Sequence, residues 1–213
     1  MSKQRHTTAD VAAFESWLSV FRRPQTVNNR VHYATRLETW ATAHGCTPWT
    51  LDTTQISAWL TTVGKSPATR KNALDAIRAF YRWGQHAGRV TGDPTAGLPH
   101  IRVPRGLPRP TPDHVLRSAV ARCTRPTDIL MLLLGSLGGL RVGEMAILRG
   151  EDINDGTIRV TGKGGHIRHV PVHPILAEAL QLVPSHGWLF PSDRNPSGHY
   201  LPNSIAQRIN DLL

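Results

Sequence analysis

The 213-residue sequence has few of the residues that mark secreted or membrane proteins. It contains only two cysteines, Cys46 and Cys123, which lie far apart and have no ligand-like spacing around them. Its longest largely apolar run, residues 129–140, is 12 residues long, whereas a membrane span needs about 20. The first ten residues are polar, unlike a signal peptide. We therefore expect no disulfide framework, no membrane span, and a cytoplasmic protein with ordinary thiols.

Acidic residues are also scarce, and their scarcity is uneven along the chain. Residues 1–110 contain 15 lysines and arginines against 6 aspartates and glutamates, whereas residues 111–213 contain 10 against 9. Of the 25 basic residues, 21 are arginine, whose planar guanidinium suits two-point contact with phosphate. A basic half joined to a nearly neutral half predicts a module that binds nucleic acid. The alternative is that the charge serves only solubility.

A proline- and arginine-rich segment separates the two halves. The stretch "PHIRVPRGLPRPTP", residues 99–112, holds five prolines. Each proline lacks an amide hydrogen and restricts the residue before it, so the stretch predicts an extended linker. The change in charge falls at the same place. We therefore predict a helical domain over residues 1–97, a linker over 98–110 and a second domain over 111–213.

The first domain is predicted to be a small helical bundle. Apolar residues at helical spacing indicate four helices, over residues 8–21, 26–44, 54–63 and 67–87. The fourth begins at Ser66 and Pro67 and ends near Gly88, as helix-capping preferences require.

The fourth helical pattern also carries a line of positive charge. In a helical projection, four basic residues fall on one line opposite the apolar face, and acidic residues are absent from that line. The four are Lys71, Arg78, Arg82 and Arg89. We expect this line to contact DNA phosphates, together with Arg102 and Arg105 of the linker. The alternative is an ordinary solvated helix face.

The second half is predicted to combine helices with a small antiparallel sheet. Helical patterns cover residues 111–123, 128–137, 141–148, 173–183 and 202–213. The stretches "GTIRV" and "IRHVPV" flank the glycine-rich "TGKGGH", which predicts a β-hairpin. The predicted fold class is mainly α with a small antiparallel sheet.

Two features of the second half could together bind a phosphate. Arg141 and Glu144 lie three residues apart after the glycine-rich "GSLGGL", so we predict that they share a helical face. Lys163 lies in the glycine loop of the hairpin, where a flexible amine could reach a ligand. A fixed guanidinium clamp and a mobile proton donor suit phosphate chemistry. Each feature has a plainer alternative, namely a helix ion pair and a simple hairpin turn.

In this order and context, the two features resemble signature boxes of the tyrosine recombinases, the phage-integrase and Xer-like family. "GLRVGEMAILRGEDI" matches the box G-(L/M)-R-x-x-E-(L/I)-x-x-L-x-x-x-D-(I/V), except that Met145 stands at an aliphatic position. "GKGGHIRHVPV" is similar to the box G-K-G-x-K-x-R-x-V-P, with His166 and Ile167 displacing the usual second lysine. The resemblance covers essentially the whole chain.

The resemblance implies a four-helix core-binding domain followed by the first part of an α+β catalytic domain. It implies that Arg141 would hold the scissile phosphate, supported by Glu144, and that Lys163 would be the general acid toward the departing 5′ oxygen. Arg168 would contact DNA. Neither a metal nor another cofactor is implied, because the energy of the broken bond would be kept in a tyrosyl–phosphate linkage.

The remaining catalytic residues of the family are not found in this sequence. After Lys163 there is no H-x-x-R, and Tyr33, Tyr81 and Tyr200 do not stand where the family has its nucleophile. We therefore expect a monomer that binds double-stranded DNA, assembles on paired half-sites and does not cleave. A truncated recombinase, a recombinase-derived repressor or immunity factor, and an unrelated basic protein acting on RNA remain as alternatives.

Overall fold

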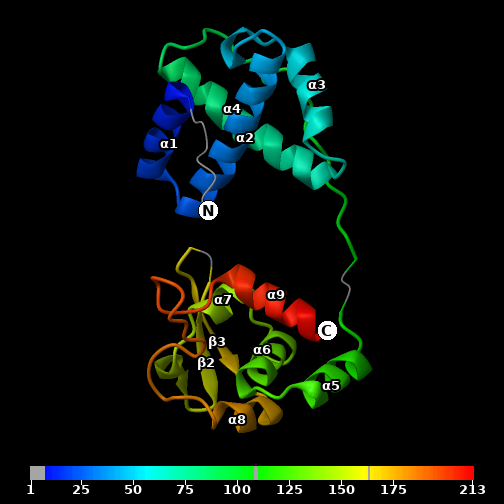
Figure 1. The fold of residues 1–213 in the computed structure, drawn as a ribbon, viewed down its shortest axis with the longest axis vertical. Coiled ribbons are helices and arrows are strands. Elements are labelled where there is room, and N and C mark those ends of the chain that lie inside the picture. The colour runs from blue at the N-terminus through cyan, green and yellow to red at the C-terminus, as the bar shows by residue number, and fades with distance from the viewer. Residues whose placement is uncertain (1–7, 108–109, 163) are drawn as a thin grey trace. The chain divides into compact units, whose positions relative to one another are not determined.

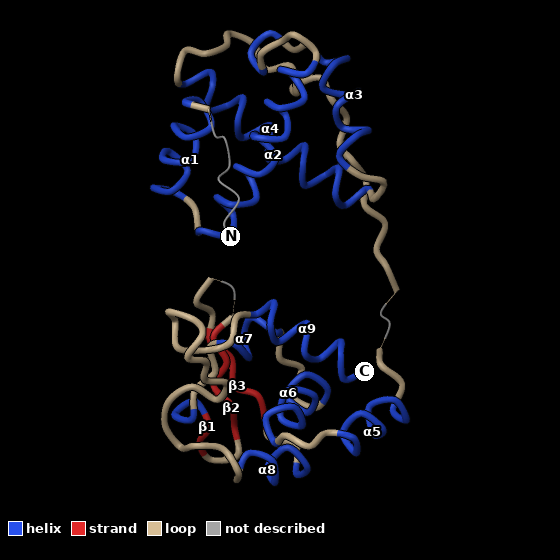
Figure 2. The backbone as a smooth tube through the Cα atoms, in the orientation of Figure 1, coloured by secondary structure: helices blue, strands red, loops and turns tan. Residues whose placement is uncertain are grey.

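A computed structural model of the protein describes residues 8–107, 110–162 and 164–213 (Figure 1). Lys163, the expected general acid, lies outside the described residues. The chain divides into two compact units, residues 1–107 and 108–213, each with its own hydrophobic core. The predicted fold class is confirmed, since the described residues are mainly helical with one small antiparallel sheet (Figure 2).

The first unit is a bundle of α-helices, each of which begins at a capping side chain or at a proline. The helices are α1 Ala9–Phe21, α2 Pro24–Ala43, α3 Thr53–Val63 and α4 Pro67–His86, with a short 3₁₀ helix at Pro48–Thr50. Proline occupies the first turn of α2 and of α4. Asp52 and Gln55 form a capping box at the start of α3. These local signals explain why the four predicted helices lie close to their expected bounds.

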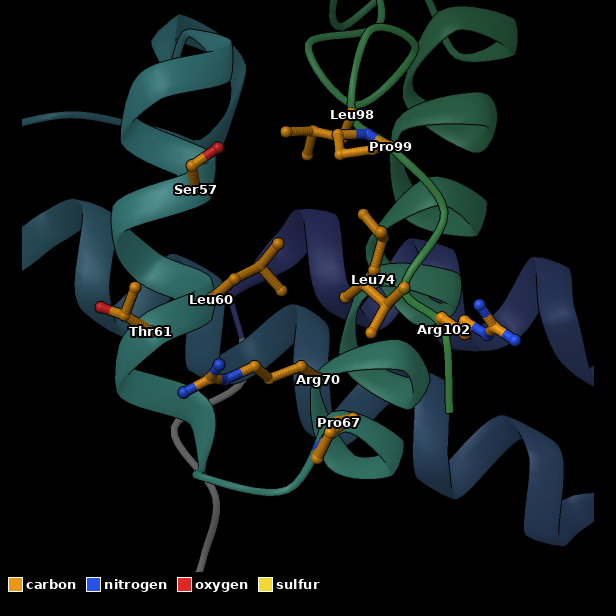
Figure 3. Close-up of a pocket in the computed structure, with 10 residues that line it drawn as sticks. Ser57, Leu60, Thr61, Pro67, Arg70, Leu74, Leu98, Pro99 and Arg102 are labelled. Carbon is orange, nitrogen blue, oxygen red and sulfur yellow. The ribbon is translucent and has the colours of Figure 1, made fainter. Parts of the chain in front are cut away.

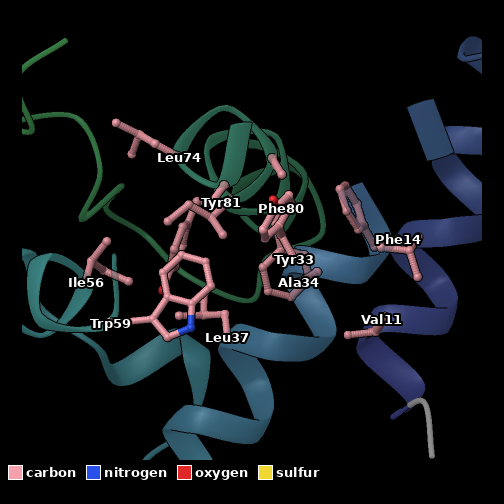
Figure 4. Close-up of a cluster of buried hydrophobic side chains, with 14 of the residues drawn as sticks. Val11, Phe14, Tyr33, Ala34, Leu37, Ile56, Trp59, Leu74, Phe80 and Tyr81 are labelled. Carbon is pink, nitrogen blue, oxygen red and sulfur yellow. The ribbon is translucent and has the colours of Figure 1, made fainter. Parts of the chain in front are cut away.

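Aromatic side chains fill the core of the first unit (Figure 4). The rings of Phe14 in α1 and Phe80 in α4 meet edge to face, with centroids 5.1 Å apart. Tyr81 is fully buried, and its hydroxyl donates a hydrogen bond of 2.6 Å to a carbonyl of the 3₁₀ helix. Gly84 makes room for the ring of Trp49, because a Cβ at position 84 would lie 2.4 Å from that ring. The packing fixes α2 against α4 and so brings their polar edges together.

The first part of the expected linker belongs to the bundle. Leu98 and Ile101 pack against the core of the first unit. The carbonyl of Leu98 also accepts a hydrogen bond of 2.9 Å from the guanidinium of Arg78. Two apolar side chains therefore hold this proline-bearing segment to the helices, and the two units divide after Leu107.

The second unit places helices around a three-stranded sheet. Its elements are α5 Asp113–Arg122, α6 Pro126–Ser136, α7 Val142–Ala146, a 3₁₀ helix at Gly150–Asp152, β1 Ile153–Asn154, β2 Thr157–Thr161, β3 Ile167–Pro171, α8 Pro174–Leu180 and α9 Pro202–Leu212. The strands are antiparallel in the order β1-β2-β3. Val160 of β2 pairs with Arg168 of β3, and the two strands form the predicted hairpin.

The glycine run after α6 turns the chain out of the core. Gly139 has a φ of +61°, a conformation that residues with a side chain rarely adopt. The amide of Leu140 bonds to the carbonyl of Leu134 at 3.1 Å and closes the turn. The Leu140 side chain then enters the second core. Arg141, the next residue, leaves that core and begins the site described below.

An ion pair holds α9 against α6. Arg208 of α9 donates through Nε to Oδ1 of Asp128 at 2.9 Å, and a second guanidinium nitrogen bonds to the other carboxylate oxygen. Asp128 is only 3% exposed. The hydrogen bond from Arg208 lowers the pKa of the Asp128 carboxyl, which therefore stays ionised inside the unit. None of the helices described here is long and apolar enough to cross a membrane.

Candidate phosphate site and nucleic-acid interface

Arg141, Glu144 and Arg168 form one hydrogen-bonded network. Arg141 lies just before α7 in extended backbone, with φ −75° and ψ 151°, so it does not share a helical face with Glu144 as predicted. Instead, the Glu144 carboxylate reaches back and accepts the Arg141 amide at 2.9 Å and its guanidinium at 2.9 Å. Arg168 of β3 donates two more bonds to the same carboxylate, at 2.7 and 2.8 Å. The Glu144 carboxylate thus connects the start of α7 with strand β3.

The three side chains differ in their exposure to solvent. The Glu144 side chain is 6% exposed, that of Arg168 is 40% exposed and that of Arg141 is 79% exposed. Arg141 gives one guanidinium nitrogen to Glu144, so most of its N–H donors face solvent. Because two cations share one anion, the network keeps a net positive charge. It can therefore attract an anion to the exposed guanidinium.

The Glu144 carboxyl is ionised at neutral pH. Hydrogen bonds from Arg168, followed by those from the amide and guanidinium of Arg141, hold the pKa of Glu144 at about 2, below its ordinary value of 4.5, although burial acts in the opposite direction. The same hydrogen bond raises the pKa of Arg168. The carboxylate can therefore accept all four bonds throughout the physiological range.

Acid should destabilise the second unit through Glu144. Its pKa is lower in the folded state than the ordinary 4.5, so its contribution is present above that pH and is lost as the pH falls toward about 2. The difference corresponds to about 3 kcal/mol of unfolding free energy. We expect Glu144→Gln to flatten the decline of stability between about pH 5 and pH 2, measured by urea unfolding followed by circular dichroism. Glu178→Gln, at an exposed carboxyl on α8, is the matched control. A Glu144→Gln profile as steep as that of the unmodified chain would contradict this assignment.

The glycine hairpin lies directly against the network. The Gly162 amide donates to the carbonyl of His166 at 2.8 Å and closes the loop. A Cβ at position 162 would lie 3.5 Å from Oε1 of Glu144 and 3.9 Å from a guanidinium nitrogen of Arg168. The loop in which Lys163 was predicted to act therefore begins at the carboxylate that holds Arg141. Within the described residues, no group of three or more histidines, cysteines, aspartates and glutamates is placed to hold a metal ion.

Comparison with known proteins places this arrangement in a family. No protein-family model matches the chain. Tyrosine recombinase XerC of Mesorhizobium japonicum is 31% identical over 232 aligned positions, which cover 92% of this chain and 73% of that relative. The chain belongs to the tyrosine recombinase family.

Other members show how much of a recombinase the chain corresponds to. Tyrosine recombinase XerC of Xanthomonas campestris pv. campestris is 31% identical over 183 positions, which cover 79% of this chain and 55% of that protein. This recombinase-family chain thus spans about half the length of that relative. A lambda integrase dimer bound to a COC′ core site has the same fold, with a TM-score of 0.73, 20% identity and coverage of 96% of this chain and 79% of that one. XerH recombinase bound to a difH substrate gives a TM-score of 0.63 and 14% identity, over 100% and 74% of the two chains.

In the first unit, the predicted basic line on α4 is not free of acidic residues. Lys71 pairs with Asp75, one turn along the helix, at 2.6 Å. Arg89 lies beyond the end of α4 and pairs with Asp10 of α1 at 2.9 Å. Arg78 donates to the backbone carbonyl of Leu98, in the segment that follows α4 and packs against the bundle. Three of the four cations therefore have partners within the unit, and their role in binding DNA stays a prediction.

Arg78 and Arg82 of the predicted line share a hollow with two arginines that lie outside α4. Four arginines line one hollow of about 320 Å³ beside Trp17 and Asp75. This arginine cluster consists of Arg22, Arg30, Arg78 and Arg82. Burial, followed by the positive charges of Arg22 and Arg82, lowers the pKa of Arg30, while Asp75 acts in the opposite direction. Like charges held close together repel, so a bound anion would lower the free energy of this surface.

Arg22 and Arg30 are not found by projecting α4 alone, because they come from the end of α1 and from α2. The one local signal is that Arg30 stands beside Val27 and Val31, at the edge of the apolar face of α2. An arginine at such an edge can lay its stem on the neighbouring helix and keep its guanidinium in water. Which neighbour it meets is set by helix packing.

A second hollow adjoins the arginine cluster and shares Arg30 and Asp75 with it. Its volume is also about 320 Å³, and the amide side chains of Gln25, Asn29 and Asn72 line it. An amide can donate and accept a hydrogen bond at once, as the edges of base pairs require.

The two predicted linker cations lie elsewhere in the first unit. Arg102 lines a mainly apolar groove of about 380 Å³ between α3, α4 and residues 98–102 (Figure 3). Arg105 is exposed. Contact of either with DNA stays a prediction.

Proposed function

We propose that this chain binds double-stranded DNA, with the arginine cluster on backbone phosphates and Arg141 on the phosphate at which recombination takes place. The observation that carries the proposal is the shared carboxylate of Glu144. It holds Arg141 at the position given by the family's first box and leaves 79% of that side chain exposed. An exposed guanidinium on a buried anchor is suited to two-point contact with a phosphate.

The proposed chemistry of the second unit is electrostatic. Phosphoryl transfer passes through a charged transition state, which preorganised cations stabilise. Arg141 would bind the non-bridging oxygens, and Glu144 would fix Arg141. Lys163 would donate a proton to the departing 5′ oxygen only where a tyrosine hydroxyl forms the new bond to phosphorus, and the non-cleaving proposal below leaves this step out for these residues. No step in this scheme requires a metal or a cofactor.

We further propose that these 213 residues bind DNA without cleaving it. No H-x-x-R follows Lys163 in the sequence. Tyr33 and Tyr81 are 7% and 0% exposed inside the first unit, and Tyr200 packs against the second core. Tyr33 and Tyr81 are therefore too buried to meet a DNA phosphate, and Tyr200 does not follow an H-x-x-R as the family's nucleophile does. Binding without cleavage also suits the second candidate function, a repressor or immunity factor derived from a recombinase.

The proposed state of assembly depends on DNA. The lambda integrase structure is a dimer bound to a core site. For this chain we propose a monomer when free, assembly on paired half-sites, and action in the cytoplasm, where bacterial DNA is found. Light scattering with and without duplex measures the first two.

A salt titration tests the DNA proposal. Fluorescence anisotropy with a labelled duplex should show affinity falling by about 10³-fold between 50 and 200 mM salt if about six phosphates are contacted. A nicked suicide duplex should yield no covalent protein–DNA adduct on a denaturing gel. Affinity that ignores salt would refute binding through phosphates, and an adduct would refute the non-cleaving part. Tighter binding to an RNA duplex would favour the RNA alternative.

A further inference from the structure

We infer that Arg168 is a positioning residue, which occupies the Glu144 carboxylate so that Arg141 remains free to bind phosphate. The inference rests on the proposed function of Arg141. It gives Arg168 a different role from the DNA contact that the resemblance implies.

The hydrogen bonds divide unequally between the two arginines. Arg168 binds both oxygens of Glu144, at 2.7 and 2.8 Å, in the side-by-side geometry that a guanidinium and a carboxylate prefer. The guanidinium of Arg141 makes one bond to that carboxylate, at 2.9 Å. Arg168 therefore directs its paired donors inward, whereas Arg141 keeps most of its donors exposed.

Charge explains why the unequal division matters. With both arginines present, the network carries one positive charge in excess. Without Arg168, the buried Glu144 carboxylate would lose two of its four bonds and would have to find other donors. The guanidinium of Arg141 is the nearest one, since it already donates to Oε1. Arg141 would turn inward and form a neutral, two-point ion pair with Glu144. A phosphate would then find no free pair of guanidinium N–H donors and no net positive charge at this site.

The backbone position of Arg168 allows its side chain to hold the Glu144 carboxylate without contacting DNA. Arg168 pairs across the sheet with Val160, whose side chain is buried. Alternation along β3 puts Arg168 on the same face as Val170, which packs against the second core. Arg168 therefore points toward α7 from the inner face of the hairpin. The hydrogen bonds from Arg168 to Glu144 also link the hairpin to α7, which begins directly after Arg141.

A double-mutant cycle distinguishes positioning from direct contact. In duplex-binding assays, Arg141→Gln and Arg168→Gln should each weaken affinity about tenfold, and the double variant should be no weaker than Arg141→Gln alone. If Arg168 instead touched a phosphate of its own, the two losses would multiply to about 100-fold. That outcome would overturn the inference.

Removal of the carboxylate supplies the sharper test. Glu144→Gln introduced into the Arg168→Gln variant should restore most of the lost affinity, because a neutral amide no longer draws Arg141 inward. Arg168→Lys should retain part of the affinity that Arg168→Gln loses, since lysine keeps the positive charge but lacks the paired N–H donors of a guanidinium. Failure of Glu144→Gln to restore affinity, in a variant shown to be folded by circular dichroism, would overturn the inference.

The ligand-free protein gives a readout that does not depend on DNA. In nitrogen-15 spectra of arginine side chains, Arg168→Gln should shift the Arg141 signal and slow rotation of its guanidinium. Arg159→Gln is the matched control, because Arg159 lies on the same hairpin and pairs with Asp152 instead of Glu144. An Arg141 signal unchanged by Arg168→Gln would overturn the inference. A shifted signal, with no effect of Arg141→Gln on DNA binding, would refute only the proposed function of Arg141.

Discussion

Replacing Arg22, Arg30 and Arg82 together with glutamine is expected to weaken duplex DNA binding by about 10²-fold or more at 0.1 M salt. These arginines surround one hollow, where a phosphate would relieve their mutual repulsion. Each lost phosphate contact reduces the steepness of log affinity against log salt by about 0.9, so the steepness should fall by about one for a single shared phosphate and by about three if each arginine contacts a phosphate of its own. Arg78 is left in place because its guanidinium already holds the Leu98 carbonyl.

The control must remove the same amount of charge from other surfaces. Lys65, Arg117 and Arg194 are exposed and lie outside the arginine cluster. Their triple replacement by glutamine should change the affinity only slightly and leave the slope nearly unchanged. Equal losses of affinity in the two triple variants would mean that net charge alone drives binding. That result would contradict the proposed contact between the arginine cluster and DNA phosphates.

The amide-lined hollow should behave differently from its arginine neighbour. Phosphate contacts fix position on the duplex, whereas base contacts give sequence preference. Changes at Asn29 or Asn72 would therefore alter which duplex is preferred and leave the salt slope intact. This separation is possible because the two hollows share Arg30 and Asp75 but are otherwise lined by different side chains.

Replacing Arg208 with alanine is expected to lower the unfolding free energy of the second unit by about 1–3 kcal/mol, the cost of leaving the Asp128 carboxylate unpaired. The change leaves Asp128, which is 3% exposed, without its two hydrogen bonds from the guanidinium. An unpaired carboxylate in such a site carries the full cost of its lost hydration. Urea unfolding at neutral pH measures the loss.

Two further variants isolate the cause of that loss. Combining Arg208→Ala with Asp128→Asn should recover much of the stability, because the buried group is then uncharged. Gln207→Ala removes only an exposed bond to Asp211 in the next turn of α9 and should cost about 0.5 kcal/mol or less. A loss in Arg208→Ala no larger than that of Gln207→Ala would show that the Asp128 pair contributes little.

The pH dependence of the Arg208→Ala variant follows from the same pair. Arg208 lowers the pKa of Asp128 in the folded chain, so the pair stabilises above the ordinary pKa of that carboxyl and the gain is lost in acid. The difference between the unmodified chain and Arg208→Ala should therefore shrink as the pH falls. The pair also matters to the site, because α9 packs on α7, the helix that carries Glu144.

The elements of this fold were predictable because their signals are local. Proline in the first turn and the residues that start each helix are read directly from neighbouring positions. The glycine loop between two β-branched stretches likewise predicts the hairpin of β2 and β3. The pair of Lys71 and Asp75 was equally readable, since residues four apart on a helix face each other.

Local spacing misled where a helix boundary decided the geometry. Arg141 and Glu144 are three residues apart, which predicted a shared helical face. The turn at Gly139 places Arg141 before the helix instead, so the carboxylate reaches back to the Arg141 amide. The contact between the two residues was predicted, but its form depends on where α7 starts.

The sequence by itself determined the uneven charge, the helices and hairpin, and the two boxes that identify the recombinase family, because each is written in adjacent or regularly spaced residues. The tertiary structure alone decided what the cations do. Arg168 meets Glu144 across 24 positions of sequence, and Arg30 joins Arg82 only because α2 packs on α4. Charge and hydrogen-bond geometry act through space, so the partner of each arginine is fixed by the packing of the elements that carry it.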